Sequence, residues 1–341
     1  MKSFIVGGTG FIGRALVKEL VSRFGADNVV CLTLPQNNDL EISGRAELAK
    51  LKVRTIPGDI RTWQPTQNEI PRFDVLFHLA ASTDSGAADH TTNDLGTEHL
   101  LNVLGDHLGG KRVVYVSTTA AMDRSGKADT PLTEQSDCFP KTEYGKTKLR
   151  AEQIVKENQS RLGFTFSILR LSTVYGYGTR KKGLFDVFEK WVRNGNPLGR
   201  IKWPGRTGLI SREDVVRILV EFAEMHETEN ETICLVTESL PIGDIPRLMA
   251  NNLNIPLSQI ELPIVFWQLI RVCLQTPGLY SIGPERLRNQ FWRLSLIADH
   301  GLWCESTKME ALYTTELTYL KEGIRDVLGL NSKENDSVMC R

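Results

Sequence analysis

The chain has 341 residues, of which 41% are hydrophobic and 24% are charged, as in an ordinary globular protein of one or two domains. Lys plus Arg and Asp plus Glu both number 41, so the formal net charge is zero, which argues against a nucleic-acid partner. The six cysteines form no C-x-x-C pair and the six histidines no H-x-x-x-H pattern, which predicts a reduced, cytoplasmic protein without a metal site.

The chain begins with a predicted strand, 4–6, followed by four glycines and a predicted helix, 12–24. Gly7 suits a tight turn, Gly10 lets the backbone approach a pyrophosphate, and Gly13 lets the helix pack close to the strand. Because amide groups at the start of such a helix bind an anion, Phe11 and Ile12 join these glycines as candidate cofactor residues. The alternative is a glycine-rich turn that binds no ligand.

The chain then continues to alternate strand and helix patterns. Further strands are predicted at 29–34, 52–56, 75–79, 112–117 and 166–169, and further helices at 46–51, 92–108 and 143–162. This order predicts an α/β fold with a Rossmann-like, doubly wound parallel sheet that has helices on both faces.

The pattern changes after about Gly176, where glycine and proline become frequent between shorter elements. Helices are predicted at 215–225, 242–253 and 264–274, and a strand at 233–235 is expected to return to the sheet. We therefore predict a dinucleotide-binding domain at 1–175, a smaller mixed α/β substrate domain at 176–330 and a disordered tail at 331–341. The aromatic residues of this region fit either a packed core or an apolar substrate pocket: Phe266, Trp267, Tyr280, Phe291, Trp292 and Trp303.

A candidate catalytic pair lies on the predicted helix 143–162. Tyr144 and Lys148 are four residues apart and therefore share a helix face. An ammonium one turn away favours the tyrosinate and lowers the tyrosine pKa, so Tyr144 could exchange a proton with a substrate hydroxyl during hydride transfer. Thr118, at the end of strand 112–117, is the candidate anchor of the substrate oxygen, with Ser117 and Thr119 beside it. The alternative is a chance Tyr–Lys pair on an exposed helix.

These motifs together resemble the extended short-chain dehydrogenase/reductase family, which includes nucleotide-sugar epimerases, dehydratases and related reductases. GGTGFIG at 7–13 resembles its cofactor turn, GDI at 58–60 its adenine site, and HLAAS at 78–82 the strand end beside the cofactor. NDLGTEHLL at 93–101 and LRLSTVYG at 169–176 resemble its later motifs. The alternatives are that Asp59 only orders a turn, that His78 is a core histidine and that Asn93 is a helix cap.

The resemblance implies a full set of site residues. The implied catalytic residues are Thr118, Tyr144, Lys148 and Asn93. The implied cofactor residues are Gly7, Gly10, Phe11, Ile12, Gly13, Thr33, Asp59, Ile60, Leu79, Ala80, Ala81, Ser117, Tyr144, Lys148, Leu171, Thr173 and Val174. Substrate contacts are expected from Thr83, Thr119, Tyr175 and Arg206.

The form of the cofactor depends on the end of the second strand, where an acidic residue binds the ribose hydroxyls of NAD. Thr33 and Leu34 occupy this position, so no carboxylate opposes a 2′-phosphate there. We therefore expect NADP slightly more than NAD, although the nearest arginine, Arg45, does not directly follow the strand.

The motifs leave several functions open. Internal redox would epimerise or dehydrate a sugar nucleotide, but Arg206 and Arg212 are displaced from the usual positions of diphosphate-binding residues. Net redox would act on a hydrophobic alcohol or ketone, for example as an NADPH-dependent reductase of a lipid, sterol or polyketide-like carbonyl. A non-catalytic dinucleotide-binding protein of the same fold is a further alternative.

Two expectations concern partners. The resemblance implies a homodimer through helices 92–108 and 143–162. The apolar segment 262–283 is too short and polar to span a membrane. We expect it to cover a substrate pocket or pack in a core, and contact with a membrane surface is the less favoured alternative.

Overall fold

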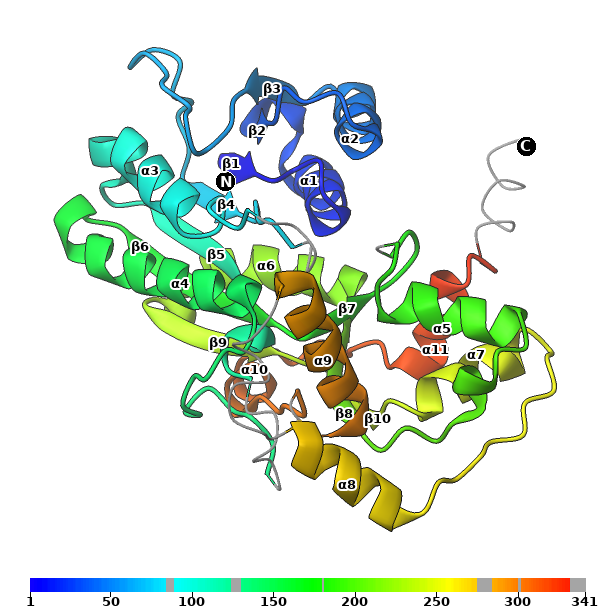
Figure 1. Cartoon of the computed structure of the whole chain (residues 1–341). Helices are drawn as coiled ribbons and strands as arrows, with labels where there is room; N and C mark the ends of the chain where they lie inside the picture. The colour runs from blue at the N-terminus through cyan, green and yellow to red at the C-terminus, as the bar shows by residue number, and fades with distance from the viewer. Residues whose placement is uncertain (84–88, 124–129, 180, 275–283, 300–301, 332–341) are drawn as a thin grey trace, which may run out of the picture.

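The computed structural model describes residues 1–83, 89–123, 130–179, 181–274, 284–299 and 302–331 (Figure 1). Its main sheet contains seven strands, all paired in parallel, in the order β3-β2-β1-β4-β5-β6-β9. The strands are β1 (Ser3–Val6), β2 (Val29–Thr33), β3 (Arg54–Pro57), β4 (Val75–His78), β5 (Arg112–Thr118), β6 (Thr165–Leu171) and β9 (Glu231–Leu235). Successive strands are added on one side of β1 as far as β3 and on its other side from β4 onward. In such sheets, ligands bind at the point between β1 and β4 where this order switches.

Helices cover both faces of this sheet. Apolar side chains of α1 (Phe11–Phe24), α2 (Asp39–Lys50), α6 (Arg212–Glu224) and α10 (Thr307–Leu312) share one buried cluster with the strands. Those of α3 (Leu95–Leu104) and α4 (Glu143–Leu162) share the cluster on the other face. The prediction of a Rossmann-like, doubly wound α/β fold is therefore confirmed.

A smaller mixed sheet lies beside the main one, in the order β10-β8-β7. β7 (Thr173–Tyr175) runs parallel to β8 (Arg206–Ser211), and β10 (Glu238–Pro241) runs antiparallel to β8. Figure 1 shows α5 (Leu184–Arg193), α7 (Asp244–Asn252), α8 (Ile264–Leu274), α9 (Glu285–Ala298) and α11 (Leu320–Val327) gathered around it. Trp203 and Trp267 are buried in their common core, with ring centroids 5.5 Å apart. Tyr280 lies outside the described residues.

Several element boundaries differ from the predicted ones. The predicted helix 46–51 is the end of α2, which begins seven residues earlier, because the Asn38 side chain accepts a hydrogen bond from Glu41 N and caps the helix. The predicted helix 92–108 is divided into α3 and a 3₁₀ turn at Gly105–Leu108. The strand predicted at 233–235 lies within β9, which starts two residues earlier and pairs with β6 in the main sheet. Of the predicted tail, only Asn331 is described.

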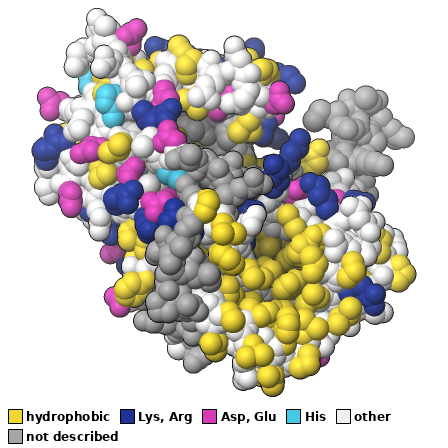
Figure 2. Space-filling model, viewed as in Figure 1, with side chains coloured by type: hydrophobic (Ala, Val, Ile, Leu, Met, Phe, Trp, Pro, Cys, Tyr) yellow, Lys and Arg dark blue, Asp and Glu magenta, His cyan; other side chains and the backbone are white. Residues whose placement is uncertain are grey.

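Helix α8 occupies an outer position on the smaller half of the molecule. Only its inner face is buried, through Trp267 and Leu274. Its outer side chains are exposed apolar residues, namely Ile264, Val265, Phe266, Leu269 and Val272. Figure 2 shows apolar side chains gathered over the part of this face where α8 and α9 lie. None of the helices that the structure describes is long and apolar enough to cross a membrane.

Candidate functional site

The glycine turn between β1 and α1 has a conformation that only glycine accommodates. Gly7 has φ +94°, and a Cβ there would lie 2.6 Å from Ala80 N. A Cβ on Gly13 would lie 2.1 Å from Gly7 O, so α1 packs directly against the turn. Gly10 N donates to Gly7 O at 3.2 Å, and nothing but that oxygen approaches a Cβ built on Gly10. The start of α1 is therefore open to an anion, as a pyrophosphate requires.

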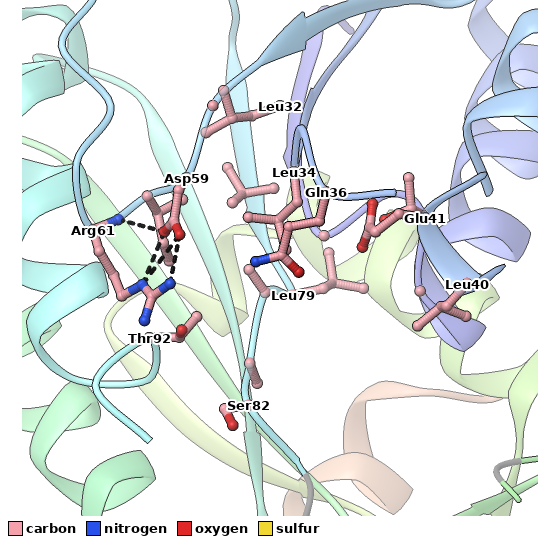
Figure 3. A pocket seen from close by; sticks show the side chains of 18 of the residues that line it. Leu32, Leu34, Gln36, Leu40, Glu41, Asp59, Arg61, Leu79, Ser82 and Thr92 are labelled. Carbon is pink, nitrogen blue, oxygen red and sulfur yellow. Dashed lines mark hydrogen bonds and ion pairs between the residues drawn. The ribbon is translucent and has the colours of Figure 1, made fainter. Parts of the chain in front are cut away.

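A cavity of about 360 Å³ lies in front of this turn (Figure 3). It is lined by seven of the predicted cofactor residues, namely Gly7, Gly10, Asp59, Ile60, Leu79, Ala80 and Ala81. Four others, Phe11, Ile12, Gly13 and Thr33, are not part of its lining. Gln36, Glu41 and Arg61 also line it, and the sequence motifs do not mark them. The glycine turn, the helix start and the cavity together fit a dinucleotide.

Asp59 lies at the wall of this cavity in an ion pair. Arg61 donates to its carboxylate, with Nη2 2.6 Å from Oδ2 (Figure 3). Arg61 also donates to Asp89 at 2.7 Å. The hydrogen bond from Arg61 is the main cause that lowers the pKa of Asp59, so this carboxyl stays ionised. Its Oδ1 also accepts from Arg61 N, so Asp59 orders the turn after β3 in addition to lining the cavity.

Tyr144 and Thr118 line a second cavity, of about 610 Å³. Thr142 caps α4 by accepting from Gly145 N at 3.0 Å, and this cap fixes Tyr144 in the first turn of the helix. Thr118 lies at the end of β5, and its hydroxyl accepts from Ala120 N at 3.2 Å. The structure thus brings these two predicted catalytic residues to one cavity.

Lys148, one turn after Tyr144, is buried, with 1% of its side chain exposed. Its Nζ donates to Val116 O at 2.6 Å and lies 4.1 Å from the centroid of the Tyr115 ring. Burial lowers the pKa of this amine to about 7, although the nearby Glu152 carboxylate favours its charged form. Lys148 itself lines neither cavity.

Asn93 connects the loop after β4 to α4, the helix that carries Tyr144 and Lys148. Its Oδ1 accepts from Ser82 N at 2.8 Å, and its Nδ2 donates to Thr147 Oγ1 at 2.9 Å. The side chain that caps α3 is that of Asp94, which accepts from Leu95 N. His78 is buried, with Nε2 2.9 Å from Thr97 Oγ1, as expected of a core histidine.

A buried polar network lies behind the Tyr144–Lys148 pair. Glu152, two turns after Tyr144, is 1% exposed and accepts from Arg170 of β6 at 2.7 Å. Ser117, a predicted cofactor residue, donates to Glu152 at 2.5 Å and lines neither cavity. No sequence motif marks this network, which joins α4 to two central strands.

The larger cavity also receives other predicted residues. Thr83, Thr119, Leu171 and Thr173 line it, whereas Val174 does not. Tyr175 is 1% exposed and donates to Thr318 O at 2.6 Å, and Arg206 donates to Ser239 O and lies over the Trp303 ring. Tyr175 and Arg206 are therefore held outside the cavity that contains Tyr144.

Two helices that were not predicted, α5 and α9, also line this cavity. Helix α5 contributes Leu184, Val187, Phe188 and Trp191, and α9 contributes Trp292, Leu294, Leu296 and Ile297. Two cationic residues, Lys182 and Arg293, are the charged residues of the lining among those the structure describes. The cavity is therefore mainly apolar, and its polar lining includes Tyr144, several threonines and Gln290 of α9.

Residues 3–233 match the model of the NAD dependent epimerase/dehydratase family. A 4-hydroxy-2-methyl-3-oxo-4-farnesyl-3,4-dihydroquinoline-1-oxide ketoreductase from Stigmatella aurantiaca is 30% identical over 184 residues, covering 52% of this chain and 51% of the relative. A putative UDP-glucose 4-epimerase from Methanocaldococcus jannaschii is 26% identical over 205 residues, covering 57% of this chain and 64% of the relative. The chain thus spans only about half the length of the ketoreductase.

The fold is also similar to solved structures. The UDP-glucuronic acid 4-epimerase of Bacillus cereus, in complex with UDP-glucuronic acid and NAD, superposes with a TM-score of 0.73 at 19% identity, covering 98% of this chain and 100% of that one. The family model covers most of the chain and includes the glycine turn and the Tyr144 helix. The protein is therefore an enzyme of the NAD dependent epimerase/dehydratase family, within the extended short-chain dehydrogenases/reductases, and its cofactor is a nicotinamide dinucleotide.

Proposed function

We propose that this enzyme interconverts a secondary alcohol and a ketone on an apolar substrate, by hydride transfer to or from its dinucleotide. One observation carries this proposal: Tyr144 and Thr118 lie in the wall of a mainly apolar cavity of about 610 Å³. Pockets for small molecules typically combine such an apolar lining with a few polar groups that fix orientation.

The dinucleotide would be held by the glycine turn, the start of α1 and the ends of β1 and β4. Gly7, Gly10 and Ala80 line this site, and Asp59 is a candidate acceptor for the adenine amino group. When bound, the nicotinamide supplies the hydride donor or acceptor. The residues of the chain then have to hold the substrate oxygen and move one proton.

We assign the proton to Tyr144 Oη, which donates it to the ketone oxygen in reduction and accepts it from the hydroxyl in oxidation. Lys148 is buried one turn away, and its amine favours the tyrosinate when the amine is charged. The Thr118 hydroxyl would hold the substrate oxygen beside Tyr144. Asn93 would be a positioning residue, because its side chain hydrogen-bonds both the loop after β4 and α4.

Two observations favour net redox of an apolar molecule. Most of the α5 and α9 side chains that line the cavity are apolar, and Gln290 and Arg293 are the polar ones, so these two helices offer few donors for sugar hydroxyls. A relative also bears the name of a ketoreductase for a farnesyl-bearing dihydroquinoline oxide.

A second candidate substrate is a sugar nucleotide. It would be epimerised or dehydrated with no net change in its oxidation state. Lys182 and Arg293 in the cavity lining could bind a diphosphate. A putative UDP-glucose 4-epimerase is among the relatives, and an epimerase of similar fold binds UDP-glucuronic acid. Homodimerisation and a cytoplasmic location remain predictions from the sequence.

The test is turnover by the purified enzyme and by two tyrosine variants. Apolar ketones and UDP-sugars are offered with each reduced or oxidised dinucleotide, and products are identified by mass spectrometry. Tyr144→Phe is expected to lower kcat by about 10²- to 10⁴-fold while dinucleotide affinity is unchanged. Tyr177→Phe is the matched control, because Tyr177 is 56% exposed and lines neither cavity.

The outcomes separate the candidate functions. Reduction of apolar ketones that depends on Tyr144 supports the proposal. Conversion of UDP-sugars alone supports the second candidate. Full activity of Tyr144→Phe contradicts the assigned role, and dinucleotide binding without any turnover favours the non-catalytic alternative.

A further inference from the structure

Glu41 places a carboxylate inside the dinucleotide cavity. It lies in the first turn of α2, is 6% exposed and lines the cavity beside Leu34 and Gln36 (Figure 3). Its Oε2 is buried and accepts no hydrogen bond from any residue that the structure describes. A buried carboxylate oxygen without a donor is costly, so this position favours a ligand that supplies one.

The packing of α2 explains why Glu41 reaches the cavity. A Cβ on Gly44 would lie 2.6 Å from Thr9 Cβ, so the absence of a side chain lets α2 pack directly on the glycine turn. Glu41 precedes Gly44 by three residues and therefore lies on the same face of the helix. The close contact at Gly44 thus brings the first turn of α2 to the end of β2.

The natural ion-pair partner of Glu41 is engaged elsewhere. Arg45 is four residues later on the same helix, but its guanidinium donates to Leu34 O at 2.6 Å and Gln36 O at 2.9 Å. It also donates to Asn37 Oδ1 at 3.2 Å. Arg45 therefore fixes the loop after β2 and does not neutralise the carboxylate.

The remaining charges of the cavity disfavour a phosphate. Glu41, Asp59 and Asp89 contribute three carboxylates to the lining. Among the residues described there, Arg61 is the one cation, and both Asp59 and Asp89 already accept from it. A 2′-phosphate would therefore meet a wall of net negative charge.

We propose that Glu41 accepts hydrogen bonds from the 2′- and 3′-hydroxyls of the adenosine ribose and makes the enzyme select NAD over NADP. In the dinucleotide-binding motif this carboxylate lies at the end of the second strand. Here Glu41 of α2 would supply it instead. This inference rests on the dinucleotide site described above, and it reverses the preference for NADP drawn from Thr33 and Leu34.

The experiment measures dissociation constants of NADH and NADPH for the full chain by fluorescence titration, without substrate. The wild type is expected to bind NADH at least 10-fold more tightly than NADPH. Glu41→Gln keeps the shape but removes the charge, and it should reduce that ratio by about 10- to 100-fold, the range for a lost charged hydrogen bond. Asp39→Asn is the matched control, since Asp39 is an exposed acid in the same helical turn and outside the lining.

Tighter binding of NADPH by the wild type, or an unchanged ratio in Glu41→Gln, overturns the assignment of Glu41 and leaves the dinucleotide site intact. An equal change in Asp39→Asn also overturns it, because the effect would then be one of general charge. Failure of the wild type to bind either dinucleotide would instead refute the site on which the proposed function depends.

Discussion

Replacing Lys148 by methionine is expected to stabilise the free protein at neutral pH while it lowers activity. Burial lowers the pKa of this amine from 10.5 to about 7. The unfolded chain therefore binds more protons than the folded one between these two values, so the stability of the wild type rises with pH in that range. The free-energy cost of burying the charged Lys148 amine applies in full below about pH 7 and disappears above about pH 10.5.

The magnitude follows from the same two pKa values. Their separation corresponds to a cost of about 5 kcal/mol in the free energy of unfolding at low pH, which falls to about 4 kcal/mol at pH 7 and about 2 kcal/mol at pH 9. Methionine avoids this cost but loses the hydrogen bond from Nζ to Val116 O, worth about 1 kcal/mol. The variant should therefore be more stable by about 3 kcal/mol at pH 7 and by about 1 kcal/mol at pH 9.

The assay is urea unfolding of both proteins without dinucleotide at the two pH values, followed by circular dichroism. Lys146→Met is the control, because Lys146 lies on the same helix with 42% of its side chain exposed and should show no such pH dependence. A stability difference between Lys148→Met and wild type that is equal at pH 7 and pH 9 would refute the argument. So would a large loss of stability at pH 7.

Two further predictions concern the glycine turn and the buried ion pair. Gly13→Ala places a methyl group 2.1 Å from Gly7 O and should weaken NADH binding more than about 10-fold in a fluorescence titration; unchanged affinity would contradict the close packing. Arg170→Met leaves Glu152 buried without its cation and should lower the free energy of unfolding by about 3–5 kcal/mol, with most of the loss recovered when Glu152→Leu is added. Equal losses in the single and double variants would show that the pair is not the cause.

The features that the sequence predicted depend on local spacing. Gly7 and Gly13 follow a strand and open a helix, so their roles are determined within a dozen residues. Tyr144 and Lys148 share a face of α4 because they are four residues apart. The seven-stranded sheet follows from the alternation of strand and helix patterns, which local hydrophobic periodicity reveals.

The features that the sequence analysis missed depend on contacts between distant segments. Glu41 lines the cavity on a helix whose Gly44 packs closely on Thr9, more than thirty residues earlier in the chain. Glu152 and Arg170 meet because α4 lies over β6. Arg206 was expected near the substrate, but the register of β8 against β10 directs it to Ser239 O. No periodic pattern encodes these distances.

The two cavities differ in how the chain supplies their walls. The dinucleotide cavity, Tyr144 and Lys148 all lie within residues 3–233, the stretch that matches the family model. The apolar lining of the larger cavity comes partly from α5, which is inside that stretch, and partly from α9, which lies beyond it. A change confined to α9 would therefore alter the lining of the larger cavity while it leaves the dinucleotide cavity and the helix that carries Tyr144 and Lys148 in place.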